Sequence, residues 1–461
     1  MNVPFLIIGS GLSGLAAAIR YARFSPEVLL LEKHSRAGGL NSFFYRNGTL
    51  IETGLHAITN YAAPKNKKAP LNQLLRQLKL HRQDIPLHEQ IQSEIHFTKR
   101  KSIFFSNDFE LLYSQIIEKF PHSADAFGRL LSAINAYDPF AVRPFISARH
   151  FLSQFLNDTL LIDMLLCPLM YYGSCTENDL DLGQFVIMFR AIFQEGMFRP
   201  QGTIKDLLDL LLQHYADLGG EIRLGSHVVR ILHNNNKVSA VELESGEIIH
   251  CDRVLSTIGY RETMKLLGED IDDTPLIRLG FIESIFQLPV SCRRTLPCDR
   301  TIIFYNQADQ FTYERPREHV DFRSGVICFP SNFQGISPKR YFEIRSTHLA
   351  NYFSWKSLQS DLVAYSEKKH ESSRRSAETI EKITGNFSEN IVYENTFTPL
   401  TVERFTTKIE GAIYGHPQKF KDGHIGFSNL FLAGTDQGYL GIVGSMLSGV
   451  SMINRHILPT L

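Results

Sequence analysis

Three glycines near the start of the chain have the spacing of a dinucleotide-binding loop. Gly9, Gly11 and Gly14 fill the pattern G-x-G-x-x-G in the stretch LIIGSGLSGL. In such a loop the first glycine permits a tight turn, the second lets the backbone approach a diphosphate, and the third lets helix and strand pack closely. The diphosphate then sits on the N-terminus of the following helix, where free N–H groups favour an anion.

An acidic residue follows at the distance expected for a ribose contact. Glu32 comes after Gly14 by close to the roughly 20 residues at which a carboxylate binds ribose hydroxyls in such sites. This carboxylate would repel a 2′-phosphate, which disfavours NADP. The loop and the acid together predict an adenine dinucleotide, and they leave NAD and FAD both open.

Two short apolar runs must position these residues. Residues 5–8 (FLII) and 28–31 (VLLL) are wholly apolar, as is typical of central parallel strands that are buried on both faces. A helical pattern begins directly after the first run. The start of the chain therefore predicts a β-α-β unit and an α/β fold.

The residues after Glu32 distinguish FAD from NAD. A second glycine pair, Gly38 and Gly39, follows closely, and residues 52–56 read ETGLH. A plain nicotinamide dehydrogenase has no need of this second pair. Here the sequence resembles the superfamily of FAD-dependent amine oxidases and phytoene desaturases, whose members carry a GG motif followed by a segment of the type D/E-x-G-x-H.

Two later stretches extend this resemblance. Residues 429–453 look like the C-terminal flavin motif of the superfamily, with a helix starting near Gly441 whose N–H groups would face the flavin pyrimidine edge. Pro200, Gly202, Val228 and Ile231 fit the pattern P-x-G-G…V-x-x-I, and Thr203 replaces its second glycine. The three stretches occur in the family's order, which makes FAD the better prediction.

The resemblance implies a Rossmann-like FAD-binding domain (GR2-type) with an inserted mixed α+β substrate domain. The FAD-binding domain would comprise residues 1–75, 196–265 and 426–461, and the substrate domain would comprise the mostly helical residues 76–195 together with residues 266–425. The residues expected to contact FAD are Gly9, Ser10, Gly11, Leu12, Ser13, Gly14, Glu32, Lys33, Gly38, Gly39, Leu40, Gly54, Leu55, His56, Val228, Gly434, Asp436, Gly441, Ile442 and Val443.

One segment indicates a branch of the superfamily. Residues 396–418 are similar to the segment TP-x-T-x-x-RF…G-x-x-YG of phytoene desaturases, carotenoid isomerases and retinol saturases. The matching residues are Pro399, Thr401, Arg404, Phe405, Gly411, Tyr414 and Gly415. The similarity implies an oxidoreductase that desaturates, isomerises or saturates carbon–carbon bonds of a long isoprenoid or polyene by hydride exchange with flavin N5. Taken alone, the segment also fits a surface loop.

The region between residues 150 and 200 suits an apolar substrate. It is rich in large apolar side chains that could wall a tunnel and exclude water around a hydride acceptor, although each also fits an ordinary helical core. These residues are Met164, Leu165, Met170, Phe185, Met188, Phe189, Phe193, Met197 and Phe198.

Three residues are candidates for the catalytic site. His56 and Asp436 could carry out acid–base chemistry, and Tyr439 could stack on the substrate or the flavin ring. Each has an alternative role: His56 as a flavin-packing residue, and Asp436 as an acceptor for the ribityl chain. No catalytic base is assigned.

Composition restricts the partners. Lys plus Arg and Asp plus Glu both number 48, so the overall charge gives no reason to expect a nucleic-acid partner. Six cysteines without a CxxC pair predict a cytoplasmic protein, and no metal-ligand spacing occurs. No apolar window is long enough for a membrane span. The basic clusters at residues 65–68, 99–101 and 368–375 could give peripheral contact with anionic lipids, or could be solvated loops.

Two other functions remain open. An amine oxidase on the same fold would have an aromatic cage near the flavin. A flavin-free prenyl-binding escort protein would have degraded cofactor motifs, whereas the glycines and Glu32 are present. The electron acceptor, oxygen or a quinone, cannot be chosen from the sequence, and an isomerase would need no net acceptor.

Overall fold

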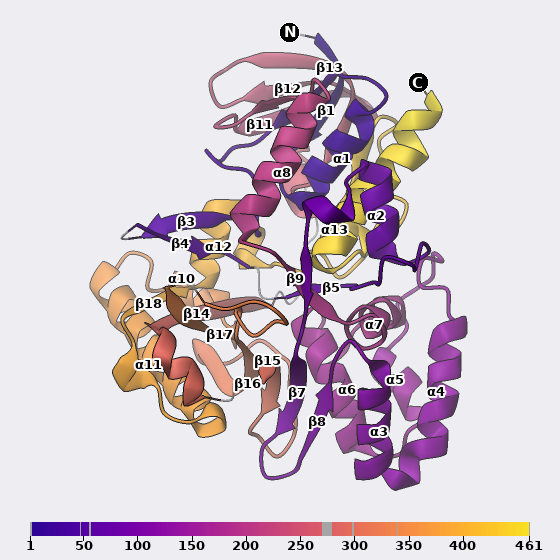
Figure 1. Cartoon of the computed structure of the whole chain (residues 1–461). Coiled ribbons are helices and arrows are strands. Elements are labelled where there is room, and N and C mark those ends of the chain that lie inside the picture. Colours follow the sequence, from indigo (N-terminus) through magenta and orange to yellow (C-terminus); the bar gives the residue numbers. More distant parts are fainter. Residues whose placement is uncertain are drawn as a thin grey trace.

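The computed structural model describes residues 2–46, 48–54, 57–269, 279–296, 299–338 and 340–460. Two seven-stranded sheets organise this part of the chain. Figure 1 shows the first sheet at the top, beside both chain ends, and the second sheet below it, next to a group of helices.

The first sheet has a parallel part and an antiparallel part. In spatial order its strands are β10 (Glu221–Arg223), β2 (Val28–Leu31), β1 (Asn2–Ile8), β13 (Ile248–Ser256), β12 (Lys237–Leu243) and β11 (Val228–Asn234), and β19 (Leu430–Leu432) also pairs with β13. The end of β13 pairs in parallel with β19, with Val254 opposite Leu430, and its start pairs antiparallel with β12. Strands from the beginning, middle and end of the chain therefore form one sheet, and the predicted Rossmann-like α/β fold is confirmed.

Alternate side chains of the central strands enter two different cores. Phe5 and Ile7 of β1 pack with the helices α1 (Leu12–Ala22), α2 (Pro70–Leu78), α8 (Ile204–Asp217) and α13 (Gly441–Met452). Leu6 and Ile8 face the opposite side, where the antiparallel strands β11 and β12 pack. Burial on both faces explains why β1 and β2 read as uninterrupted apolar runs.

The second sheet joins segments that lie far apart in the sequence. Its strands are, in order, β18 (Tyr393–Phe397), β14 (Gly280–Pro289), β17 (Tyr341–Ala350), β16 (Val320–Cys328), β15 (Arg300–Asn306), β7 (Gln92–Phe97) and β8 (Lys101–Phe105). The helices packed beside it are α3 (Phe109–Lys119), α4 (Ala124–Ala136), α5 (Ala148–Ser153), α6 (Thr159–Tyr171) and α7 (Leu182–Phe189). This mixed α+β unit matches the expected architecture of the insert, and its exact boundaries stay a prediction.

Smaller elements lie between these two sheets or pack against one of them. They are the hairpin β3 (Phe43–Arg46) and β4 (Thr49–Glu52), the three-stranded sheet of β5 (Ile58–Thr59), β9 (Met197–Pro200) and β6 (Leu87–Glu89), and the helices α9 (Tyr260–Leu267), α10 (Tyr352–Lys356), α11 (Leu362–Thr384) and α12 (Pro399–Thr406). Figure 1 shows β3, β4, β5 and β9 at the level where the two sheets meet.

The apolar residues predicted to wall a tunnel form solid core. The nine residues predicted to wall the tunnel, from Met164 to Phe198, have side chains that are at most 2% exposed. Eight of them pack in the cluster that joins α3–α7 to the second sheet, and Phe198 packs under the first sheet. A side chain without accessible surface cannot line an open tunnel, so in this structure the tunnel interpretation fails for these residues. Within the described ranges, no helix is long and apolar enough to cross a membrane.

Candidate cofactor and active site

The glycines of the dinucleotide loop differ in what surrounds them. Gly9 has a φ of 96°, and its N–H donates to the carbonyl of Leu31 (2.8 Å), so the loop turns directly from β1 over the end of β2. A Cβ added to Gly14 would overlap the carbonyl oxygen of Gly9. A Cβ at Gly11 would have nothing within 4 Å. The third glycine is therefore required for packing, whereas the second faces open space of the kind that a diphosphate needs.

The second glycine pair lies against this loop. The N–H of Gly38 donates to the carbonyl of Ser10 (2.9 Å), and a Cβ at Gly39 would lie 3.2 Å from Cα of Gly11. A Cβ at Gly54 would lie 2.7 Å from the carbonyl oxygen of Leu40. Gly38 and Gly39 therefore lie against Ser10 and Gly11 of the first loop, and Gly54 lies against Leu40.

Glu32 is held at the end of β2 by three donors. Its Oε2 accepts from the N–H and the hydroxyl of Ser10 (2.9 and 2.8 Å), and Oε1 accepts from the N–H of His34 (2.9 Å). A carboxylate has about four acceptor positions, so capacity for ribose hydroxyls remains. Burial lowers the pKa of the neighbouring Lys33 ammonium, against the effect of Glu32 itself.

The segment between β10 and β11 completes this end of the site. The N–H of Ser226 donates to the carbonyl of Glu32 (2.7 Å), and the buried Val228 packs in the same core cluster as Leu31. Val228 therefore packs on the same side of the first sheet as Leu31, the residue before the ribose-binding candidate. Thr203, the departure from the family pattern, caps α8 instead: its N–H and hydroxyl both donate to Asp206 (2.7 Å each).

The two chain ends meet at the contact between α1 and α13. A Cβ at Gly449 would overlap the carbonyl oxygen of Ser13, so these helices approach closely. The hydroxyl of Ser13 is buried and has no hydrogen-bond partner among the described residues. Gly434 donates to Ser448 (2.6 Å), which fixes the loop before α13. These contacts place the first and last predicted motifs side by side.

The N-terminus of α13 faces the interior of the protein. The helix begins at Gly441 without a side-chain cap, and Ile442 and Val443 are buried. Space in front of Gly441 is limited by Thr59 of β5, whose Oγ1 would lie 2.8 Å from a Cβ at that glycine. Uncapped N–H groups at this position fit the predicted flavin contact. Leu55 and His56, which were also predicted to contact the cofactor, lie outside the described residues.

Asp436 has the contacts of a structural carboxylate. Its two oxygens accept from the N–H groups of Tyr260 and His416 (2.6 Å each). Burial alone would raise its pKa, but Lys408 and Lys419, together with these hydrogen bonds, lower the pKa below its ordinary value. A buried carboxylate that stays ionised is a poor proton shuttle. Its predicted catalytic role is untested, and its observed contacts join the loop before α13 to the start of α9 and to the segment that contains His416.

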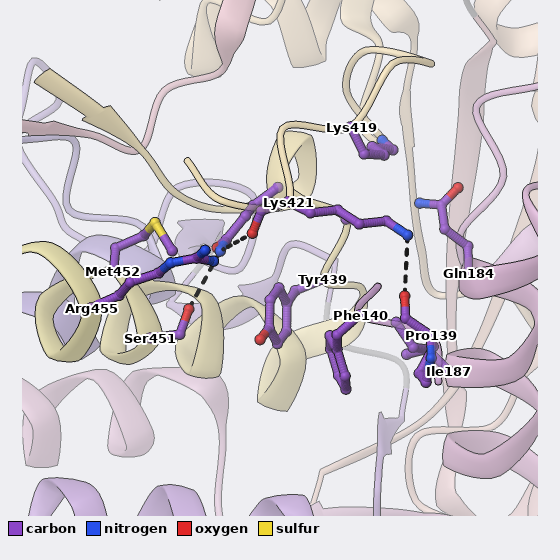
Figure 2. Close-up of a pocket in the computed structure, with 12 residues that line it drawn as sticks. Pro139, Phe140, Gln184, Ile187, Lys419, Lys421, Tyr439, Ser451, Met452 and Arg455 are labelled. Carbon is purple, nitrogen blue, oxygen red and sulfur yellow. Dashed lines mark hydrogen bonds between the residues drawn. The ribbon is translucent and has the colours of Figure 1, made fainter. Parts of the chain in front are cut away.

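Tyr439 lies in a small pocket, shown in Figure 2, that no residue of the dinucleotide loop lines. Its ring packs against Phe140 with centroids 5.4 Å apart. Burial raises the pKa of its hydroxyl, which Ser451 partly offsets. Stacking of Tyr439 is therefore observed with a protein side chain, and its predicted role toward substrate stays a prediction.

Buried ion pairs near the centre were not among the predicted site residues. Glu52, at the end of β4, pairs with Arg199 of β9, and it also accepts from the N–H of Ile204 at the start of α8 (2.5 Å). Arg345 pairs with Glu343 (2.6 Å) and Glu283 (3.3 Å). Burial would lower the pKa of Arg345, but Glu343, Glu283 and Glu52 outweigh burial and raise it. These charges form one network. Of the residues named here, Glu52 alone belonged to a motif recognised in the sequence, the ETGLH segment.

Residues 396–418 connect the loop before α13 to the end of α6. A Cβ at Gly415 would overlap the carboxylate of Asp436, so this segment lies directly on the loop that precedes α13. The next residue back, Tyr414, donates its hydroxyl to the carbonyl of Tyr171 at the end of α6. Two residues after Tyr171, a Cβ at Gly173 would lie 2.5 Å from the side chain of Leu440, the residue before α13. Tyr414 and Gly415 therefore lie between α6 and the loop before α13, whereas Arg404 and Phe405 of the same segment are exposed.

Comparisons with known proteins agree with this arrangement. The family model of flavin containing amine oxidoreductases matches residues 12–316. The chain is 25% identical over 289 residues to a phytoene desaturase (lycopene-forming) from Pseudescherichia vulneris, a match that covers 57% of each protein, so it spans little more than half of that relative. It is 21% identical over 462 residues to prolycopene isomerase 1 from an Oncidium hybrid cultivar, covering 91% of this chain and 76% of the isomerase.

A solved structure shows the same fold. An oxidoreductase from Methanosarcina mazei superposes with a TM-score of 0.68 over 98% of this chain and all of the other chain, at 16% identity. The predicted resemblance is thereby confirmed, and the family implies a flavin cofactor. The chain belongs to the family of flavin containing amine oxidoreductases.

Proposed function

We propose that this protein is an FAD-dependent oxidoreductase acting on carbon–carbon bonds of a long apolar polyene or isoprenoid. The observation that carries the proposal is the position of residues 396–418, which link the loop before α13 to α6 through Gly415 and Tyr414. This is the segment that resembles carotenoid-modifying enzymes. The relatives of the chain by sequence include a phytoene desaturase and a prolycopene isomerase.

The described residues fit FAD. Glu32 would bind the ribose hydroxyls, the open space at Gly11 and the N-terminus of α1 would hold the diphosphate, and the N-terminus of α13 would face the pyrimidine edge of the flavin. When bound, a flavin supplies a hydride acceptor and donor at its N5 atom. The residues of this chain bind and orient both molecules and exclude water.

Two tyrosines are candidates for the substrate-facing wall. Tyr172 and Tyr414 are only partly buried although they pack against the apolar core cluster. Burial raises the pKa of both phenols, so both are neutral. The Tyr172 hydroxyl, near Glu283 and Tyr414, has no hydrogen-bond partner among the described residues. With so few polar groups, recognition of an isoprenoid would rest on shape.

An amine oxidase is the second candidate. The rings of Phe281 and Tyr414 meet edge to face with centroids 5.5 Å apart, and Tyr172 and Glu283 lie near them. Aromatic faces and a carboxylate can bind an ammonium group. This arrangement is the specific observation that keeps amine oxidation open.

A substrate panel separates the two candidates. The flavin-loaded protein is mixed without oxygen with phytoene, a squalene-type polyene, retinol, and primary and secondary amines, and the visible spectrum of the flavin is followed. If the protein desaturates a polyene, that polyene should reduce the flavin and bleach its visible absorbance. We expect amines to leave the flavin spectrum unchanged. Bleaching by an amine alone would refute the proposal. Oxygen and quinones are then tested as acceptors for the reduced flavin.

A further inference from the structure

A small basic pocket lies outside the predicted flavin site. It has a volume of about 120 Å³, and its lining includes Phe140, Gln184, Lys419, Lys421, Tyr439 and Arg455. Three of these side chains are cationic, and none is an aspartate or a glutamate. Figure 2 shows Lys419, Lys421, Arg455 and Gln184 arranged around the rings of Tyr439 and Phe140. Such a lining favours an anion.

Gln184 contributes a buried donor to this pocket. Its side chain is only 4% exposed, and Nε2 has no hydrogen-bond partner among the described residues. Buried amide groups are almost always hydrogen-bonded, because an unmet donor costs folding free energy. A ligand oxygen in the pocket would satisfy this donor. The unmet donor is independent of the cationic lining and also indicates an acceptor-rich ligand.

The lysines keep donor capacity. Lys421 Nζ donates to the carbonyls of Pro139 (3.2 Å) and Ala141 (2.9 Å), and Lys419 Nζ donates to the carbonyl of Tyr414 (2.9 Å). An ammonium group has three donors, so each lysine retains at least one. The charge of Lys419 is partly offset by the nearby Asp436. Arg455 is exposed at the rim.

An exposed apolar loop adjoins the pocket. Phe140, which lines the pocket, is 54% exposed, and Val142 and Phe145 of the same loop are 78% and 55% exposed. Arg143 lies between them and is also exposed. Large apolar side chains beside cationic ones are typical of surfaces that bind the membrane interface. Lys421 fixes the start of this apolar loop (residues 138–146) to the pocket through its two carbonyl contacts.

We propose that the basic pocket binds the phosphate of an anionic membrane lipid while Val142 and Phe145 enter the bilayer. The cationic lining, the buried donor of Gln184 and the exposed apolar loop each fit one part of a phospholipid: its charge, its phosphate oxygens and its acyl region. Lipid binding needs no turnover, so its failure would be distinguishable from a failure of the proposed polyene chemistry.

The test uses the full chain and vesicles of defined composition. Sedimentation with phosphatidylcholine vesicles, with or without phosphatidic acid, measures binding. Lys419→Gln/Arg455→Gln removes two charges from the pocket, Gln184→Met removes the buried donor, and Val142→Ser/Phe145→Ser removes the apolar contact. Lys237→Gln/Lys382→Gln is the matched control, because it removes two exposed charges that lie outside the pocket and outside the three basic clusters of the sequence. Inorganic phosphate is titrated separately, and circular dichroism checks that each variant is folded.

We expect binding only with phosphatidic acid, weakened about 10-fold or more by the pocket pair and also by the apolar pair, and within about twofold of wild type in the control pair. Gln184→Met should reduce binding without a change of net charge. Equal losses in the control and pocket pairs would overturn the proposal, since binding would then follow overall charge. Tight binding of inorganic phosphate without vesicle binding would overturn the lipid as the source of the phosphate.

Discussion

Substituting the second glycine of the dinucleotide loop should reduce flavin binding without harming the fold. Gly11 has φ −60° and ψ 170°, which alanine adopts freely, and its added Cβ would contact nothing within 4 Å. The flavin-free Gly11→Ala protein should be as stable as wild type, or more stable by about 0.4–1 kcal/mol, because alanine restricts the unfolded chain. The methyl group would occupy space that the diphosphate needs.

The expected loss of affinity follows from the backbone contacts at risk. A hydrogen bond to a charged group contributes about 1.5–3 kcal/mol, so displacing the diphosphate from one backbone N–H should weaken flavin binding about 10- to 100-fold. Gly14→Ala provides the contrast. Its Cβ would overlap the carbonyl oxygen of Gly9, so backbone must shift, at a cost of about 1–3 kcal/mol or more in the free energy of unfolding.

Two measurements on each variant separate these effects. Urea unfolding of the flavin-free protein gives the free energy of unfolding, and titration with FAD, followed by quenching of flavin fluorescence, gives the affinity. Gly11→Ala should lower the affinity for FAD and leave the free energy of unfolding unchanged or slightly higher. Gly14→Ala should lower the free energy of unfolding even without FAD. Wild-type FAD affinity in Gly11→Ala would refute the assignment of the open space at Gly11 to the diphosphate.

Three further changes have defined outcomes. His348 is buried between the hydroxyls of Tyr305 and Ser376, and burial lowers its pKa to about 4. The free energy of unfolding, measured with urea, should therefore fall by up to about 3 kcal/mol as the pH drops from about 6.5 to 4. Glu52→Gln should cost about 3 kcal/mol or more by weakening the buried pair with Arg199, and adding Arg199→Met should cost less than the two single effects summed. Thr203→Ala should cost about 1 kcal/mol through loss of the α8 cap.

Each of these changes has a contradicting result. The sign for His348 follows from its neutral folded form: the unfolded chain binds the proton more readily between the two pKa values, so acid favours unfolding. An unfolding free energy in His348→Gln that varies with pH as steeply as in wild type would exclude this histidine as the cause. Strict additivity of Glu52→Gln and Arg199→Met would exclude their coupling. A free energy of unfolding that is unchanged in Thr203→Ala would exclude a stabilising contribution of Thr203 as the cap of α8.

The cofactor end could be predicted from sequence because its signals are backbone requirements. Gly9 needs a positive φ and Gly14 needs space beside Gly9, so residue type at these positions reports the local structure. Apolar runs marked β1 and β2, since both faces of these strands are buried. The contact of α1 with α13 could be expected only through the family resemblance, because nothing local in either helix specifies a partner so far along the chain.

The substrate region was less predictable because composition does not specify orientation. The phenylalanines and methionines of α6 and α7 read equally well as tunnel wall and as core, and the structure places them in the core. The Glu52–Arg199 pair joins β4 to β9 through tertiary contact, which no spacing in the sequence indicates. Similarly, the structural role of Asp436 depends on N–H donors from Tyr260, at the start of α9, and from His416, neither of which is close to Asp436 in the sequence.

The central claim is that the bound flavin acts on carbon–carbon bonds of an apolar polyene. It is tested most directly by the mass and isomer composition of phytoene, or of a related polyene, after a single anaerobic turnover with the flavin-loaded protein. We predict either a loss of two hydrogens with reduced flavin, which indicates desaturation, or unchanged mass with altered retention, which indicates isomerisation. Recovery of every polyene unchanged, while an amine is oxidised under the same conditions, would contradict the claim.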